Sequence, residues 1–357
     1  MTDAIPIRNL YYMLAYAYRC LDQRDFSGLE AEPFENACDL FATILARGLS
    51  GQIRRGLERS YVPRRETLSA PRGRIDVSAS IKEQSLARLR LPCRYDEYSE
   101  DIPANQVMKL TARYLCRSGQ VSQSRRDALK RLLPFLSGVS DLSPGSVRWD
   151  QVKCRPDNRR CRSLIGICRL VMEHLLFANP DGSQEIRGYM DGQPMHLLYE
   201  KFILEYYRRH FPGLSPNPEM IRWNVTGGQA LHLPLMRTDL VLRGGGKTLI
   251  IDAKYYSHSM QSYRDPDSPT IRSGNLYQIY AYAKNLDRDR TGSVAGLLLY
   301  ARTKEPVVPD DSCEIDGTLI AAKTLDLSLP FPEIAGQLDR IAQPLLDKPA
   351  HPWNTAI

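Results

Sequence analysis

The chain has 357 residues, of which 43% are hydrophobic and 25% are charged, and its net charge is +7. This composition is typical of a soluble globular protein with room for two domains, and it excludes a disordered chain. No apolar run is long enough to span a bilayer, and Asp3 stands where a basic leader would begin. We therefore expect a cytoplasmic protein with no membrane partner. Its positive net charge favours an anionic binding partner.

The first half of the chain predicts a mixed α+β domain. Residues 5–21 and 33–56 have the apolar patterns of two helices, the first of them buried nearly all round. Strands are expected at 61–68, 73–78 and 89–95, and helices at 103–116, 125–136 and 164–177. The turn-forming run Asn179-Pro180-Asp181-Gly182-Ser183 predicts the boundary between an N-terminal domain, 1–180, and a second domain, 181–357.

Charged residues gather in three places in this half. The acidic turn 96–101 is one, and two arginine-rich segments are the others. Such segments are solvated faces, docking surfaces or phosphate contacts. Our interpretation favours partner docking for the first segment and DNA contact for the second. The arginines singled out are Arg54, Arg55, Arg59, Arg64, Arg65, Arg72 and Arg74 in the first, and Arg159 and Arg160 in the second.

The eight cysteines show no C-x-x-C pair and no zinc-finger spacing with histidine. Three of them, Cys154, Cys161 and Cys168, recur every seven residues, which indicates coincidence or one face of a helix. For a cytosolic protein we expect all eight to be reduced thiols.

Residues 236–256, MRTDLVLRGGGKTLIIDAKYY, predict a β-hairpin with strands 238–242 and 248–255. A loop at 244–247 pairs Asp239 with Asp252, and the two-residue period places Lys254 on the same face as Asp252. Facing carboxylates suit Mg²⁺, for which Mn²⁺ can substitute. Lys254 would orient or deprotonate water and offset charge on the phosphorane. The alternative is the solvated face of an ordinary hairpin.

The run Gly244-Gly245-Gly246-Lys247-Thr248 is similar to the end of a phosphate-binding loop. Val241 stands where that loop needs its leading glycine, and a strand follows where a helix is required. We therefore expect this chain to bind no nucleotide itself.

Helices flank the hairpin in the sequence. The first, 197–211, places Glu200 on its apolar stripe, either as a third acidic site residue or in a salt bridge to Arg208 or Lys201. After a loop at 266–269 that would close over a substrate, a helix from residue 274 carries Gln278, and 294–300 is a buried strand. This order of elements is that of an α/β nuclease core with a central sheet between helices.

Asp239, the triplet Asp252-Ala253-Lys254 and the helix with Gln278 resemble the PD-(D/E)XK nuclease superfamily. Thr238 stands where the superfamily's name has proline, a position that binds no metal. Other segments are similar to the McrC family, the nuclease subunits of modified-cytosine restriction systems. These are IPIRNLYYMLAY at the start, RGRID at 72–76, DEYSEDIPANQVMKLT at 96–111 and LYEKFILEYY at 198–207.

The resemblance implies an α+β N-terminal domain followed by an α/β restriction-endonuclease-like domain with a central mixed sheet. It also implies Mg²⁺-dependent cleavage of double-stranded DNA containing modified cytosine. Asp239 and Asp252 would hold the metal, and Lys254 and Gln278 would act on the water. The implied partner is a McrB-like AAA+ GTPase hexamer, whose GTP hydrolysis the N-terminal domain would stimulate. Alternatives are an inert adaptor of that motor, or a stand-alone resolvase or repair nuclease.

Overall fold

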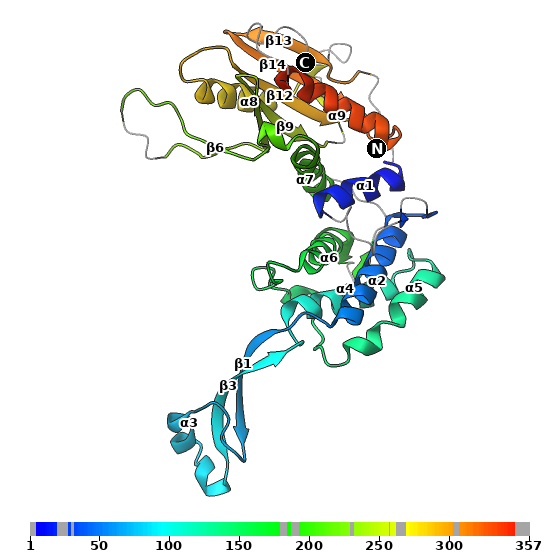
Figure 1. Cartoon of the computed structure of the whole chain (residues 1–357), viewed down its shortest axis with the longest axis vertical. Helices are drawn as coiled ribbons and strands as arrows, with labels where there is room; N and C mark the ends of the chain where they lie inside the picture. The colour runs from blue at the N-terminus through cyan, green and yellow to red at the C-terminus, as the bar shows by residue number, and fades with distance from the viewer. Residues whose placement is uncertain are drawn as a thin grey trace. The chain divides into compact units, whose positions relative to one another are not determined.

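The computed structural model describes residues 5–19, 28–29, 32–178, 184–186, 193–228, 232–256, 258–261, 269–302 and 307–346. The chain forms two compact units (Figure 1). Unit 1 comprises Met1–Asp22, Gly28–Ala37 and Tyr189–Ile357, and unit 2 comprises Gln23–Ser27 and Cys38–Gly188. Among the described residues, no helix has the length and apolar character needed to cross a membrane.

This division differs from the expected domains 1–180 and 181–357, because the first helix joins the C-terminal part. Helix α1 (Ile7–Ala17) is buried, as predicted, and packs on α7 (Gln193–His210). The Tyr16 hydroxyl lies 2.8 Å from His210 Nε2. The Asn9 amide donates hydrogen bonds of 2.7 Å to the carbonyls of Leu327 and Leu329. The expected break at 179–183 lies outside the described residues.

A five-stranded mixed sheet forms the centre of unit 1, in the order β13-β14-β12-β9-β8. Strands β9, β12 and β14 are parallel, and both edge strands are antiparallel to their neighbours. Helix α8 covers one face, and α7 and α9 cover the other (Figure 1). This confirms the predicted mixed sheet with flanking helices. The bounds are β8 Leu240–Gly244, β9 Lys247–Lys254, α8 Ser273–Leu286, β12 Val294–Ala301, β13 Asp311–Ile315, β14 Thr318–Leu325 and α9 Phe331–Leu346.

The β8–β9 hairpin has the predicted register, with Val241 opposite Ile250. Its turn is shorter than expected, because Gly244 and Lys247 pair as the last residues of the strands. Gly245 and Gly246 have φ angles of 55° and 73°, which glycine adopts without strain and which match the twist of a two-residue hairpin. Short pairs elsewhere in unit 1 are β6 Met220–Ile221 with β7 Met236–Arg237, and β10 Met260–Gln261 with β11 Thr270–Ile271.

Unit 2 contains a helical body. Its core lies between α2 (Ala37–Arg55), α4 (Pro103–Arg117) and α6 (Arg159–Leu170), with α5 (Gln123–Lys130) beside α4. Helices α2 and α6 approach closely at Gly48, which has no side chain. A Cβ at this position would lie only 2.2 Å from the Leu164 side chain. After α6 the chain forms a short π-helix at Val171–Leu175 and then the pair β4 Leu176–Ala178 and β5 Gln184–Ile186. The α-helix expected at 164–177 therefore begins and ends earlier.

A long antiparallel arm extends from this body (Figure 1). It consists of β1 (Ser60–Leu68) and β3 (Leu91–Ser99), with the short β2 (Arg74–Ile75), α3 (Val77–Lys82) and a 3₁₀ turn (Ser85–Arg88) at its far end. The turn predicted at 96–101 is wrong over its first residues, because 96–99 complete β3 opposite β1. The far end exposes large apolar side chains, namely Val77, Ile81, Leu86 and Leu89, of which Leu89 is 85% exposed.

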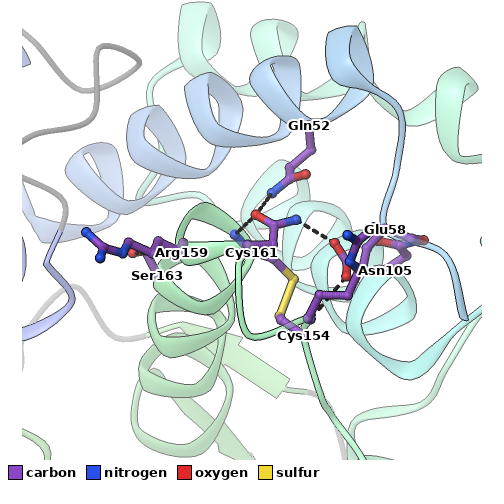
Figure 2. The surroundings of a disulfide bond; sticks show 9 residues. Gln52, Glu58, Asn105, Cys154, Arg159, Cys161 and Ser163 are labelled. Atoms are coloured by element: carbon purple, nitrogen blue, oxygen red, sulfur yellow. Dashed lines mark hydrogen bonds between the residues drawn. A yellow bond between two sulfur atoms is a disulfide. The ribbon is translucent and has the colours of Figure 1, made fainter.

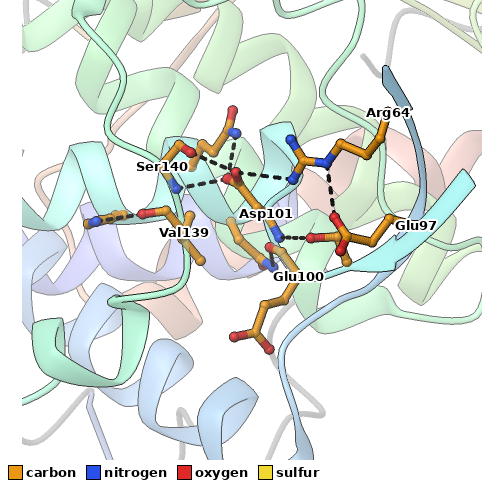
Figure 3. A network of polar contacts seen from close by, with 10 residues as sticks. Arg64, Glu97, Glu100, Asp101, Val139 and Ser140 are labelled. Atoms are coloured by element: carbon orange, nitrogen blue, oxygen red, sulfur yellow. Dashed lines mark hydrogen bonds and ion pairs between the residues drawn. The ribbon is translucent and has the colours of Figure 1, made fainter. Parts of the chain in front are cut away.

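Charges near the root of the arm neutralise one another (Figure 3). Arg64 Nε donates to Glu97 at 2.9 Å, and Arg59 contacts Glu100 at 3.2 Å. Asp101 accepts hydrogen bonds from Gln106 at 2.7 Å and from Ser140 N at 2.8 Å. These acidic residues therefore hold the arm to the body as well as carrying surface charge.

A disulfide joins Cys154 and Cys161, whose Cα atoms are 6.0 Å apart, so the prediction of eight reduced thiols is wrong (Figure 2). Asn158 caps α6 by accepting from the Cys161 N–H at 3.0 Å, which fixes Cys161 in the first helical turn, beside the preceding loop. Glu58, just before the arm, accepts hydrogen bonds from Asn158 and from Arg155 N at 2.5 Å and 3.1 Å.

Candidate active site

The structure brings four of the predicted site residues together at one end of β9. Asp252 and Lys254 are buried on the face of β9 that α8 covers. Lys254 Nζ lies 2.7 Å from Asp252 Oδ2 and donates a 3.1 Å hydrogen bond to Gln278 Oε1. Gln278 in turn donates to the Tyr282 hydroxyl at 2.8 Å, one turn further along α8. Asp239, just before β8, accepts the Ala253 N–H at 2.9 Å.

Negative charge is concentrated at this end of the sheet. Burial and the nearby carboxylates of Asp252 and Glu200 raise the pKa of Asp239 to about 8. Burial lowers the pKa of Lys254, but the charge and hydrogen bond of Asp252 outweigh it, so the pKa of Lys254 is raised. Lys254 is therefore a cation at neutral pH, and Asp239 would ionise more readily if another positive charge were present.

Glu200 belongs to the same electrostatic group. Burial raises its pKa, and its charge interacts with those of Asp252 and Lys254. Its side chain contacts His196 Nε2 at 3.0 Å, not Arg208 or Lys201 as the alternative prediction had it. Arg208 contacts Glu205 at 2.9 Å. His196 was missed because the helix was expected to begin at residue 197, whereas α7 begins at Gln193; its i, i+4 spacing from Glu200 was the available signal.

The donor set fits a hard divalent cation held partly by water and substrate. Asp252 Oδ2 is buried and, apart from its ion pair with Lys254, accepts no hydrogen bond, and Asp239 presents a second carboxylate. No three His, Cys, Asp or Glu side chains of the described residues form a complete metal-binding group. Mg²⁺ is commonly bound by only one or two carboxylates, with waters and phosphate oxygens completing the shell. Asp239 and Asp252 are therefore the residues that would hold it.

The predicted arginines all belong to unit 2, whereas the carboxylate cluster belongs to unit 1. Arg54 and Arg55 end α2, whereas Arg159 and Arg160 begin α6. Within the arm, Arg65 contacts Asp76 at 3.2 Å, together with Arg94. Arg72 lies 4.0 Å above the Tyr95 ring, and Arg74 is exposed on β2. Pairing of Arg59, Arg64 and Arg65 within the arm reduces the free charge expected for docking.

Comparison with known proteins gives concordant results. The chain is 29% identical over 338 residues to the type IV methyl-directed restriction enzyme EcoKMcrBC of Escherichia coli K12, covering 94% of this chain and 96% of that protein. Its fold is similar to a half-complex of Thermococcus gammatolerans McrB AAA+ hexamers with bound McrC. The TM-score is 0.51 at 18% identity, covering 96% of this chain and 76% of that one.

A second structure, the McrBC complex of the same archaeon, matches with a TM-score of 0.39 at 21% identity, covering 57% of this chain and 58% of that chain. The family described as McrBC 5-methylcytosine restriction system component matches residues 5–301, most of both units. The chain therefore belongs to the family of McrBC 5-methylcytosine restriction system components.

Proposed function

We propose that the chain is the Mg²⁺-dependent endonuclease subunit of a GTP-dependent restriction complex that cleaves DNA containing modified cytosine. The observation that carries this proposal is the contact of Lys254 with both Asp252 and Gln278, beside Asp239 at the same end of the sheet. An acid pair, a buried lysine and an orienting amide are the groups that phosphodiester hydrolysis requires. Membership of the restriction family supports the same substrate class.

The residues divide the chemistry between them. Asp239 and Asp252 would hold the metal, which supplies Lewis-acid activation of water and the scissile phosphate. Lys254 has a raised pKa, so it favours stabilisation of developing negative charge over removal of a proton from water. Gln278 fixes the direction of the ammonium group, since its own amide is anchored on Tyr282. Within the hairpin, the glycine turn at 245–246 joins two paired strands and so lacks the helix that follows a phosphate-binding loop.

The partner we propose is a McrB-like AAA+ GTPase hexamer, because the similar archaeal assembly contains such hexamers with bound McrC. The far end of the arm supports docking to a protein, since exposed apolar groups at Val77, Ile81 and Leu89 gather there. Arg54, Arg55 and Arg59 are the alternative contact. Ile81→Asp is expected to abolish stimulation of partner GTPase activity, whereas reversal of these three arginine charges would weaken it less. The opposite order would transfer the docking role to the arginines.

Asp252→Ala tests the activity directly. We expect the assembled complex with this variant to leave plasmid DNA bearing 5-methylcytosine uncut in Mg²⁺ and GTP, while partner binding and GTPase stimulation persist. Arg288→Ala is the matched control, because Arg288 is exposed beyond α8, towards the opposite end of β9. Full cleavage by Asp252→Ala would identify the chain as an inert adaptor. Cleavage by the isolated wild-type chain without nucleotide would instead favour a stand-alone nuclease.

A further inference from the structure

Arg272 stands at the start of α8, the helix that supplies Gln278 to the site. Its guanidinium lies over the Tyr256 ring, with Cζ 4.8 Å from the ring centroid. Its Nη2 donates a 3.0 Å hydrogen bond to the His258 carbonyl. Stacking on an aromatic ring and bonding to the backbone restrict this long side chain, so the positive charge is held at a defined position.

Tyr256 connects this arginine to the site. It follows Lys254 by two residues and packs against the core cluster to which α8 contributes. Its hydroxyl donates to Asn275 Oδ1 at 3.3 Å, and Asn275 lies about one helical turn before Gln278. Along α8, about 9 Å of helix separates Arg272 from Gln278. Arg272 therefore lies just beyond the end of β9, on the side of the sheet that α8 covers.

The charge of Arg272 makes no ion pair within the part of the chain that the structure describes. Its Nε is buried and has no hydrogen-bond partner. The other half-buried arginines in the described part of unit 1 are Arg208 and Arg243, which contact Glu205 and Glu219. A partly buried cation without a counterion is costly, so we expect an anion from outside the chain to bind here.

We propose that Arg272 is a positioning residue for DNA, and that its remaining guanidinium N–H groups bind the phosphate next to the scissile one. This inference rests on the proposed nuclease function and adds a phosphate contact to its site. The space beside the start of α8 is open, because a Cβ at Gly274 would meet no atom within 4 Å. Phosphate contacts fix the register of a protein on DNA. A rigid cation beside Lys254 would therefore set the direction in which the cleaved strand crosses the acidic residues.

The test is binding of the full chain to duplex DNA, with Ca²⁺ in place of Mg²⁺ to limit cleavage, measured by fluorescence anisotropy over a series of salt concentrations. Each phosphate contact contributes about 0.9 to the slope of log affinity against log salt concentration. Arg272→Gln should reduce the slope by about this amount. Arg272→Lys keeps the charge and should keep the slope, although it alters the stacking on Tyr256. Arg288→Gln is the matched control with an unchanged slope, because Arg288 is exposed beyond the other end of α8.

An unchanged slope in Arg272→Gln would overturn the phosphate contact, and so would a wild-type chain that binds no duplex DNA. If Arg272→Gln and Arg272→Lys lose affinity equally and keep the wild-type slope, Arg272 is a structural link and the positioning role is refuted. The nuclease proposal fails separately. Loss of cleavage in Asp252→Ala with an unchanged slope in Arg272→Gln would leave an endonuclease without this contact. Full cleavage by Asp252→Ala with a reduced slope in Arg272→Gln would leave the DNA contact on an inert adaptor.

Discussion

Replacing Asp239 by asparagine should change how the stability of the metal-free protein depends on pH. The pKa of this carboxyl is raised to about 8 in the folded chain, against an ordinary value near 3.8. The stabilisation due to its proton is therefore complete below the unfolded-state pKa and is lost as pH rises through the folded one. Between the two values the folded state holds one more proton than the unfolded state, so the free energy of unfolding falls by about 1.4 kcal/mol per pH unit.

When the pH rises from about 6 to 7.5, deprotonation of Asp239 should lower the free energy of unfolding of the wild type by roughly 2 kcal/mol. Asp239→Asn has no proton to lose at this position and should not show this decrease. The assay is urea unfolding of both proteins in EDTA at the two pH values. Unit 2 is the same in both, so its contribution cancels in the comparison. Added Mg²⁺ should abolish the difference, because a bound cation favours the ionised carboxylate. Equal pH dependence of the two proteins in EDTA would refute the argument that burial and neighbouring carboxylates hold a proton on Asp239.

Three further predictions concern single contacts. Gln278→Leu should lower the cleavage rate about tenfold or more, because Lys254 loses the hydrogen bond that orients its ammonium group. Mn²⁺ affinity should be unchanged, because no metal ligand is altered. Single-turnover kinetics would measure the rate, and an unchanged rate would contradict this role. Gly296→Ala should lower the free energy of unfolding by about 1–3 kcal/mol, because the added Cβ would lie 2.6 Å from the Ile279 side chain. Calorimetry measures the change, and an unchanged melting temperature would mean that α8 repacks without cost. Asn9→Ala should cost about 2 kcal/mol by leaving two carbonyls without a donor, and unchanged unfolding in urea would argue against this anchor.

The hairpin could be predicted from sequence because everything that determines it is local. The glycines fix the turn and the two-residue period fixes the faces. The resulting ladder ends at Leu240 opposite Ile251, so Asp239 and Asp252 are the next residues beyond this pair. Gln278 could be placed on a helix by periodicity, but its hydrogen bond to Lys254 depends on how α8 packs against the sheet. The local sequence pattern therefore predicted the positions of the acids and the lysine, but not the hydrogen bonds that surrounding elements make to them.

Long-range contacts explain what the sequence did not reveal. Nothing near Asn9 indicates that its amide binds carbonyls at Leu327 and Leu329, more than 300 residues away. The seven-residue spacing of Cys154 and Cys161 has no meaning until Asn158 is known to cap α6 between them. The sequence did not indicate the apolar far end of the arm, because residues 77–88 form short helical turns. Their large apolar side chains face solvent, so they need not follow the periodic stripe of a helix packed on a core.

The division of the chain has a consequence for biosynthesis. Helix α1 leaves the ribosome before unit 2, but its packing partner α7 begins only at Gln193, and the Leu327 and Leu329 carbonyls that Asn9 binds come later still. In the sequence, unit 2 lies almost entirely between α1 and α7, so it can fold during translation. Until α7 has been made, the apolar α1 has no helix to pack against. A nascent chain stalled before α7 would therefore expose this helix to chaperones, and the central sheet cannot be completed until β14 has been made.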